Sequence, residues 1–220
     1  MKITLDDVKN NEDVEQFILA AQHQIDVLGF TEHAHRHLNI VSQRAGEILR
    51  TLGYDEDRVR LAEIAAYLHD IGNAINRTDH AHTGAILAND ILKDMGMPVN
   101  ERAEIAMAIG NHDELTGTAV SDISAALILA DKSDAHRSRV TKTNISLFDK
   151  HDRVNYAVTD AKLEINGETK KVTLRLTIDT NMCPVLDYFE IFMDRTRMSK
   201  YAAKYLKIWF ELVINGTRLL

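Results

Sequence analysis

Histidine and aspartate occur at positions where a helical pattern calls for apolar residues. His37 shares a helical face with Val41, and His69 follows Ala65 by one turn at the end of an apolar segment. Asp70 comes next, where an unpaired carboxylate is costly to bury and opposes the negative end of the helix dipole. These side chains predict a cation in the interior of the protein.

Three further positions repeat this placement. His80 shares a face with Leu87, His112 lies at the inner end of its own segment, and Asp131 continues the face of Leu127. Imidazole and carboxylate together suit borderline and hard divalent metals. With the three residues above, they exceed what one catalytic metal with an open position needs. Two metals bridged by a carboxylate would use all six, and such a pair activates water as hydroxide and clamps a phosphoryl group.

The segments that carry these residues are predicted to be helices. Up to about residue 142, every periodic apolar pattern has the spacing of a helix. The predicted helices cover residues 12–28, 31–52, 56–71, 80–95, 100–111 and 121–139. Thr31, Asn100 and Ser121 are suited to cap three of them, and Gly29 follows the first as a C-terminal stop. Because the connections are short, we expect a bundle.

The periodicity changes after about residue 152. Val172, Leu174 and Leu176 alternate with polar residues, and Asn166-Gly167 before them is a strong hairpin signal. Residues 185–208 predict an amphipathic helix, and residues 210–214 predict a third strand. We therefore predict a mainly α protein with two parts. Residues 1–142 form a helical metal-binding domain, and residues 143–220 form a small α+β extension (hairpin, helix and strand) packed on the bundle.

The composition is that of an ordinary globular protein with an acidic balance. Of 220 residues, 45% are hydrophobic and 27% are charged, and the formal net charge is −7. This balance argues against a nucleic-acid polymer as partner, which would need a basic stripe, whereas a small phosphorylated substrate needs only a local group of cations. The lone cysteine, Cys183, excludes an internal disulfide. With no apolar run near the roughly 20 residues of a membrane helix and no signal-peptide pattern, we expect no membrane segment and a cytoplasmic location.

The ordered set of ligand candidates resembles the HD superfamily of metal-dependent phosphohydrolases. The motifs that carry the resemblance are His37, His69 and Asp70 in YLHDIGN, His80 in DHAHTGA, His112 in GNHDE and Asp131 in ILADKSD. His80 and His112 match the two extra histidines of the dinuclear members. The resemblance spans roughly residues 31–139.

The resemblance implies a helical core, a divalent metal, and hydrolysis of phosphomonoesters or phosphodiesters, commonly of nucleotides. Iron or manganese is expected, with magnesium, nickel, cobalt and zinc as alternatives. It implies one metal on His37, His69, Asp70 and Asp131. It implies a second metal on His80 and His112, with Asp70 as the bridging catalytic carboxylate.

Two departures from family patterns limit the substrate, and several polar residues could contact it. Asn73 stands where families with an HDIGK motif have lysine, and the GYP signature of cyclic-dinucleotide phosphodiesterases is absent, so cyclic-di-GMP is not predicted. Candidate ligands for substrate oxygens are Lys132, Arg77, Asn73 and Arg137, with Arg139 nearby. Arginines in such places are more often solvated or ion-paired.

Three functions are compatible with these residues. The leading hypothesis is a cytoplasmic metal-dependent phosphohydrolase of a small nucleotide or related phosphate ester. The second is an HD-type di-iron oxygenase, which would use the same ligands. The third is a non-catalytic metal-binding sensor or assembly module, since free strand edges in the C-terminal region could pair with a partner or form a homodimer.

Overall fold

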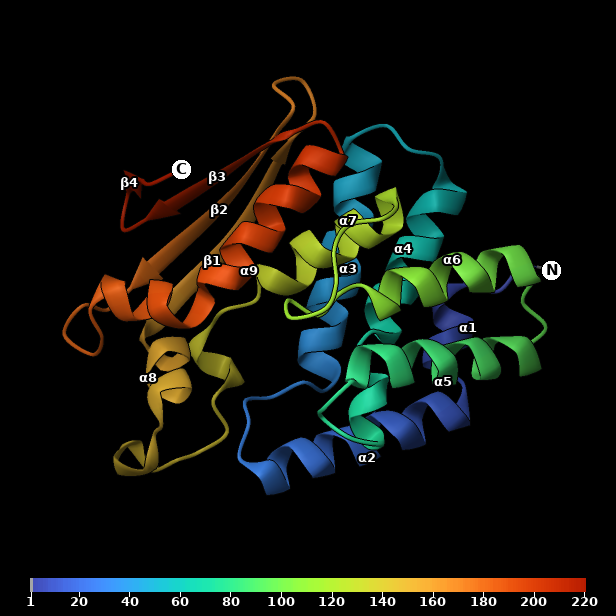
Figure 1. Cartoon of the computed structure of the whole chain (residues 1–220), viewed down its shortest axis with the longest axis horizontal. Helices are drawn as coiled ribbons and strands as arrows, with labels where there is room; N and C mark the ends of the chain where they lie inside the picture. The colour runs from blue at the N-terminus through green and yellow to red at the C-terminus, as the bar shows by residue number, and fades with distance from the viewer. Residues whose placement is uncertain (1) are drawn as a thin grey trace.

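The computed structural model describes residues 2–220, and it combines a helical bundle with a small sheet (Figure 1). The helices are α1 (Leu5–Lys9), α2 (Glu12–Leu28), α3 (His35–Thr51), α4 (Glu56–Leu68), α5 (His80–Asp94), α6 (Val99–Gly110), α7 (Asp122–Lys132), α8 (Lys150–Ala157) and α9 (Val185–Tyr205). Short 3₁₀ segments are η1 (Ile71–Ala74), η2 (Arg137–Arg139) and η3 (Ile145–Leu147). The strands are β1 (Val158–Asn166), β2 (Lys171–Ile178), β3 (Trp209–Ile214) and β4 (Thr217–Arg218). The predicted mainly α fold with a C-terminal α+β region is confirmed.

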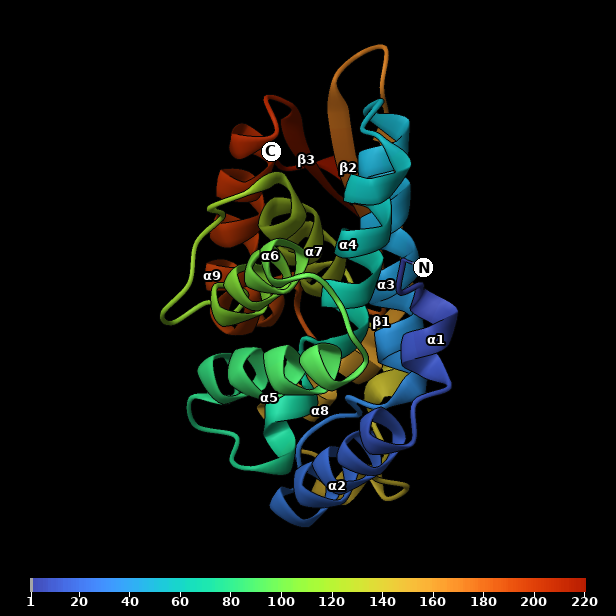
Figure 2. The same ribbon diagram turned by 90° about the vertical axis from the view of Figure 1, so that its right-hand side faces the viewer.

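The bundle is organised around α3, α4 and α7. These three helices pack against one another, α5 packs against α6, and α2 packs against η1, the segment just after α4. Figure 2 shows α2 and α5 near each other on one side of this core. The inward faces are apolar, as the spacing predicts, and Val41, Leu68 and Leu127 have no exposed surface. The elements that carry the candidate ligands therefore meet in one core.

Some helix ends follow the predicted signals. Gly29 ends α2 as predicted, in the left-handed region at φ 77°, where glycine has no steric penalty. The Asn11 side chain caps the start of the same helix, which was not predicted. The Ser121 hydroxyl caps α7, as predicted, by accepting from the Ser124 N–H. Pro98, rather than the predicted Asn100, stands at the start of α6.

Other predicted helix ends are also wrong. Thr31 does not cap α3, which begins four residues later at His35. The Glu32 carboxylate instead accepts from the N–H groups of Ala34 and His37, so it satisfies free donors of that end. The last predicted helix of the bundle, residues 121–139, stops at Lys132, where the Ser133 hydroxyl donates to the Ala130 carbonyl and closes the turn.

The C-terminal region contains a four-stranded sheet in the order β1-β2-β3-β4. β1 and β2 are antiparallel, as the Asn166-Gly167 signal predicts, although the turn between them spans residues 167–170. β2 and β3 are parallel, with α9 as the connection between them. α8 and β4 were not among the predicted elements. Asp149 caps α8 in a reciprocal pair with Asp152, which accounts for that helix.

This region packs directly on the bundle. α9 lies against α7, and β1 lies against α3, and both views show the sheet flanking these helices (Figures 1 and 2). A separate apolar cluster, which includes Val158, Leu176 and Phe192, fills the space among α8, α9 and the sheet. Among residues 2–220, no helix is long and apolar enough to cross a membrane. The division at residue 142 stays a prediction.

Candidate metal centre

The six predicted ligands come from five elements or their ends and meet in the core. His37 lies in the first turn of α3, His69 and Asp70 follow α4, His80 is the first residue of α5, His112 follows α6, and Asp131 lies near the end of α7. All six are at most 5% exposed. The helix ends therefore position the ligands, while the apolar faces behind them fix the distances between the helices.

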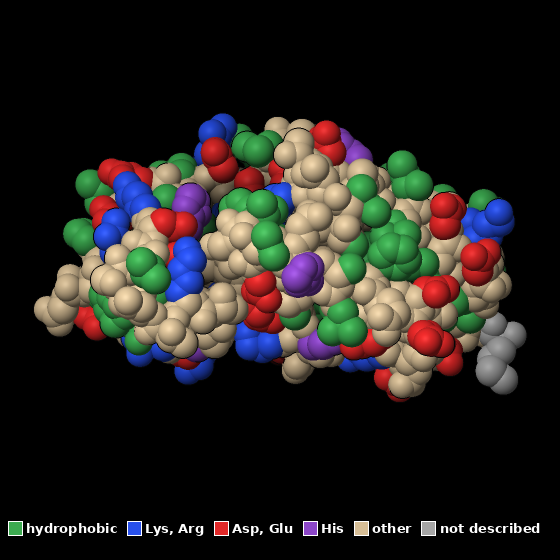
Figure 3. All heavy atoms as spheres, turned by 90° about the horizontal axis from the view of Figure 1, so that it is seen from below, with side chains coloured by type: hydrophobic (Ala, Val, Ile, Leu, Met, Phe, Trp, Pro, Cys, Tyr) green, Lys and Arg blue, Asp and Glu red, His purple; other side chains and the backbone are tan. Residues whose placement is uncertain are grey.

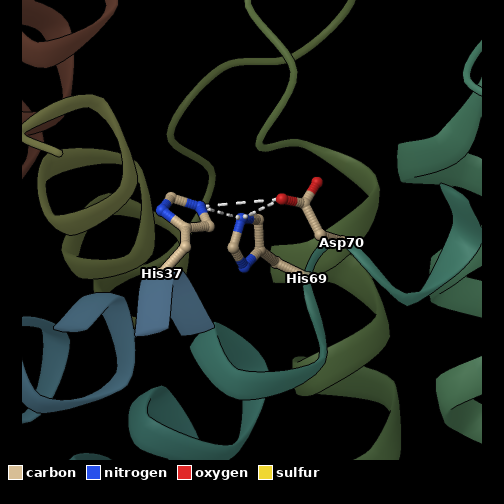
Figure 4. A group of neighbouring side chains, drawn as sticks. All are labelled: His37, His69 and Asp70. Carbon is tan, nitrogen blue, oxygen red and sulfur yellow. Dashed lines mark hydrogen bonds and ion pairs between the residues drawn. The ribbon is translucent and has the colours of Figure 1, made fainter. Parts of the chain in front are cut away.

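One group of ligand atoms surrounds the Nε2 atom of His37. It lies 3.4 Å from His69 Nε2, 3.6 Å from Asp70 Oδ2 and 3.4 Å from Asp131 Oδ1. Figure 4 shows His37, His69 and Asp70 directed toward one another. Metal–ligand bonds are about 2.0–2.2 Å, so two ligand atoms on one ion sit roughly 3–3.5 Å apart. These separations match the edges of a coordination shell.

A second group lies on the other side of Asp70. His80 Nε2 and His112 Nε2 are 3.2 Å apart, and they lie 3.5 Å and 3.9 Å from Asp70 Oδ1. The other oxygen of the same carboxylate, Oδ2, lies 3.2 Å from His69 Nε2. Asp70 thus presents one oxygen to each group, which is the arrangement of a bridging carboxylate.

The hydrogen bonds of the four imidazoles fix which nitrogen faces inward. The Nδ1 atoms of His69 and His112 lie 2.7 Å and 2.6 Å from the carbonyls of Ala66 and Ile109, so each Nδ1–H donates there. His80 Nδ1 also lies against a backbone carbonyl, and His37 Nδ1 lies against a carboxylate. A neutral imidazole then carries a lone pair on Nε2. Two neutral rings that face each other through Nε2 lone pairs cannot bond each other, so a proton or a metal cation between them would satisfy both.

The charges of the centre also favour a cation. Burial lowers the pKa of His69, but Asp70 and Asp131 outweigh burial and raise it to about 10. Burial opposes ionisation of Asp70, yet the charge of His69 holds its pKa well below 3.8. The pKa of His112 is shifted in the opposite direction to that of His69. Burial, and then the charge of His69, lower it well below 6.5. The ligand set, with four imidazoles and two carboxylates, fits one or two divalent ions.

Asp134 is a further residue of the centre that was not predicted from the sequence. Its Oδ2 atom accepts from His37 Nδ1–H at 2.7 Å and from Arg36 at 3.1 Å. A carboxylate behind a metal-binding histidine fixes the tautomer and raises the basicity of the ring. Asp134 follows Asp131 by three residues, just past the end of α7, and that spacing is the only signal that could have indicated it.

Lys132 connects the centre to the C-terminal region. The Lys132 ammonium is 2.7 Å from Asp131 Oδ2 and 2.6 Å from the Glu114 carboxylate. Arg195 of α9 donates through Nε to the other oxygen of Glu114 at 3.1 Å. Burial disfavours the charge of Lys132, but Asp131 and Glu114 outweigh it and raise its pKa. Lys132 was predicted as a substrate ligand, and its described contacts are with carboxylates of the site.

The other predicted substrate ligands have different surroundings. Asn73 is fully buried, and its Nδ2 donates to Asp70 Oδ1 at 3.0 Å, so it orients the bridging carboxylate. Arg77 donates to Asn73 Oδ1 at 3.1 Å and lies 3.9 Å from Asp70 Oδ1. Arg137 and Arg139 lie in η2 and not on α7, where the predicted helix would have placed them. Asn73 and Arg77 are therefore the predicted substrate ligands that adjoin the bridging carboxylate.

The two η2 arginines support the surrounding structure. The Arg137 guanidinium lies over the Tyr156 ring at 5.1 Å. Arg139 is almost fully buried and donates to the carbonyls of Glu32 and Asp134. Because these carbonyls belong to the segments before α3 and after α7, Arg139 joins the two loops behind His37. The structure therefore gives Arg139 a bracing role in place of the predicted contact with substrate.

A cleft of about 170 Å³ adjoins the centre. Its lining includes Phe30, His33 and Arg77 from the bundle, together with Phe192 and Arg195 from α9. Three carboxylates also line it, and each is paired with cations: Glu114 with Lys132 and Arg195, and Asp149 and Asp152 with Lys142. His33 is buried, and its ring packs edge-on against the ring of His37, with centroids 5.7 Å apart. A second hollow of about 280 Å³ lies beside the first turn of α5 and shares Arg77 with the cleft. The centre is therefore adjacent to space that a small molecule can enter.

Comparison with known proteins places this arrangement in a family. Residues 21–144, more than half of the chain, match the family model of the HD domain. An uncharacterized protein of Methanocaldococcus jannaschii is 29% identical over 161 residues, which are 63% of this chain and 61% of the length of that relative. The crystal structure of a predicted HD superfamily hydrolase from an uncultured Thermotogales bacterium is 27% identical, over 61% of this chain and 75% of that one, with a TM-score of 0.44. HD domains bind divalent metals, and the match of the family model shows that this chain belongs to the HD domain family.

Proposed function

We propose that this protein is a divalent-metal-dependent phosphohydrolase that acts on a small phosphate ester. The observation that carries the proposal is the pairing of inward-facing Nε2 atoms on both sides of one carboxylate. His37 and His69 form one pair at 3.4 Å, and His80 and His112 form the other at 3.2 Å, with Asp70 between them. This arrangement fits two ions, with iron or manganese as the expected metals.

The chain and the metals have separate tasks in this proposal. Bound divalent ions supply Lewis acidity for an attacking water and for the phosphoryl oxygens. Asp70 lies between the two groups of histidines and would contribute a ligand oxygen to each, and Asn73 holds the Asp70 carboxylate in place through its Nδ2–H. Asp134 keeps the Nδ1 proton on His37 and leaves Nε2 free for a metal. Lys132 partly neutralises the Asp131 carboxylate and keeps it in position.

The surroundings favour a phosphorylated substrate over the dioxygen chemistry of HD-type oxygenases. Arg77 and Arg195 line the cleft beside the centre, and arginine forks match phosphoryl oxygens in geometry and charge. The substrate is expected to be small, because the cleft is about 170 Å³. On the face drawn in Figure 3, the described basic and acidic side chains are interspersed and form no continuous basic stripe of the kind a nucleic-acid polymer would use.

Turnover of a broad panel of phosphomonoesters and phosphodiesters by metal-loaded protein tests the proposal. We expect hydrolysis with manganese or iron, and loss of both bound metal and turnover in His69→Ala and Asp70→Ala. His23→Ala is the matched control, because His23 is exposed on α2. Full activity in either ligand variant would refute the assignment. Consumption of dioxygen by the reduced iron form, without hydrolysis of any ester, would support the oxygenase alternative instead.

A further inference from the structure

The cleft beside the metal centre has a wall that lies outside the part of the chain matched by the HD domain model. The model ends at residue 144, whereas Phe192 and Arg195 of α9 line the cleft together with bundle residues. α9 is held in this place by its packing on α7, the helix that carries Asp131. The C-terminal region thus has a fixed position relative to the ligands.

Arg195 is held on two sides but keeps free donors. Its Nε donates to Glu114 at 3.1 Å, and its guanidinium carbon lies 4.8 Å from the centroid of the Phe192 ring. Within residues 2–220, its two terminal nitrogens have no hydrogen-bond acceptor, and the side chain is 17% exposed. A guanidinium fixed in this way loses little entropy when it binds an oxyanion.

Arg77 repeats the same arrangement from another part of the chain. One terminal nitrogen donates to Asn73 Oδ1 at 3.1 Å, and the guanidinium carbon lies 5.8 Å from the centroid of the Phe30 ring. The side chain is 30% exposed and lines the same cleft. Two guanidinium groups, each supported by an aromatic ring and an oxygen acceptor, therefore line one small cleft.

These two arginines exceed what a single phosphoryl group needs in this site. In a two-metal hydrolase the ions hold the oxygens of the phosphoryl group that reacts. Arg77 lies 3.9 Å from Asp70 Oδ1, close to that position. Arg195 is connected to Asp131 through Glu114 and Lys132, so it lies further from the metal positions than Arg77 does. Its free donors are placed for a second anionic group on the same substrate.

We propose that Arg195 binds a second phosphoryl group next to the reacting one that Arg77 adjoins, so the substrate is a phosphate ester with two adjacent phosphoryl groups, such as a nucleoside diphosphate. This inference rests on the proposed function, because it assumes that the metal centre receives the reacting phosphoryl group. It gives the C-terminal region a role in substrate selection. Arg195 is a substrate-binding residue that the family-matched segment does not contain.

Binding of two inert probes to metal-loaded protein tests this inference without turnover. The probes are inorganic phosphate and methylenediphosphonate, which carries two phosphonate groups and resists hydrolysis. We expect wild-type protein to bind the diphosphonate about 10- to 100-fold more tightly than phosphate, the range for loss or gain of a charge-assisted hydrogen bond. Arg195→Ala should remove most of this preference, and Arg77→Ala should weaken binding of both probes.

Matched variants separate the inference from general effects. Arg197 lies on the same helix, is exposed and pairs with Asp194, so Arg197→Ala should keep the preference. Arg195→Lys keeps a cation beside Glu114 but lacks the fork, so an intermediate preference is expected even if the alanine variant folds poorly.

Two results have different meanings. Equal binding of the two probes by wild-type protein, or an unchanged preference in Arg195→Ala, would overturn the inference and leave the proposed hydrolase intact. Failure of metal-loaded protein to hydrolyse any ester would instead overturn the proposed function, whatever the probes show.

Discussion

Replacing Asp134 with asparagine should weaken one metal position and spare the other. Asp134 is 2% exposed, and its Oδ2 atom accepts from His37 Nδ1–H at 2.7 Å. Burial opposes its ionisation, but the hydrogen bond from His37 outweighs this and holds the pKa of Asp134 well below 3.8. The charged form therefore supports the ring, and it makes the Nε2 atom of His37 a better donor to a metal.

The expected size of the effect follows from these contacts. Loss of a carboxylate behind a metal-binding histidine costs about 10- to 100-fold in metal affinity, or roughly 1.4–2.8 kcal/mol. In Asp134→Asn the new side-chain amide keeps an oxygen that can accept from His37, so we expect a loss of about tenfold. Asp134→Ala removes the acceptor and leaves Arg36 without this partner, so we expect a loss toward the upper end of that range.

Competition with a fluorescent chelator measures the affinity of each metal position. The position formed by His80 and His112 should keep its affinity in Asp134→Asn, because Asp134 bonds to His37 on the opposite side of the bridging carboxylate. Asn181→Ala, at an exposed position, is the control for general effects of substitution. Equal weakening of both positions, or no weakening at either, would refute the reasoning about Asp134.

Two other substitutions should change stability in ways that differ from the metal effects. In Gly72→Ala the new Cβ would lie 2.0 Å from the His80 carbonyl oxygen and 2.5 Å from the Gly84 nitrogen, so η1 and α5 must separate. The melting temperature should fall by roughly 2–12 °C. The metal position at His80 should also lose its ion. In Glu211→Gln the loss of thermal stability should depend on pH. The reason is that hydrogen bonds from Lys171 and from a threonine lower the pKa of Glu211 below 4.5. The charged form stabilises the fold above that value, so melting curves of wild type and variant should differ at pH 7 and converge as pH falls through the lowered pKa.

Each of these has its own contradicting result. Gly84→Ala is the milder control for Gly72→Ala, since its Cβ would lie 3.1 Å from the nearest atom. Equal destabilisation by the two substitutions would contradict the steric argument. A constant difference in melting temperature across the acidic range below pH 7 would contradict the role given to the charge of Glu211.

The ligand positions were predictable because each breaks an apolar pattern. A histidine or aspartate on a face otherwise made of residues such as Val41 and Leu127 needs a partner in the core, and each candidate could be found from its own helix. The same local signals predicted α2 and its end at Gly29, which the structure confirms. Which ions the ligands hold stays a prediction.

The residues that were missed depend on contacts between distant segments. Arg195 reaches the site only because α9 packs on α7, and nothing in its own helix distinguishes it from Arg197. Arg139 was expected near substrate, but its burial between two loops depends on the chain turning after Lys132. That turn is closed by the Ser133 hydroxyl, which competes with continuation of the helix.

Metal content per chain, measured on protein prepared without chelator and then on His80→Ala, tests the central claim most directly. We predict two divalent ions per chain in the wild type, because Asp70 presents one oxygen to each pair of histidines. In His80→Ala we predict one ion, with the position at His37 and His69 still filled. A wild-type protein that binds no divalent ion, or a variant that keeps both, would contradict the proposed two-metal centre.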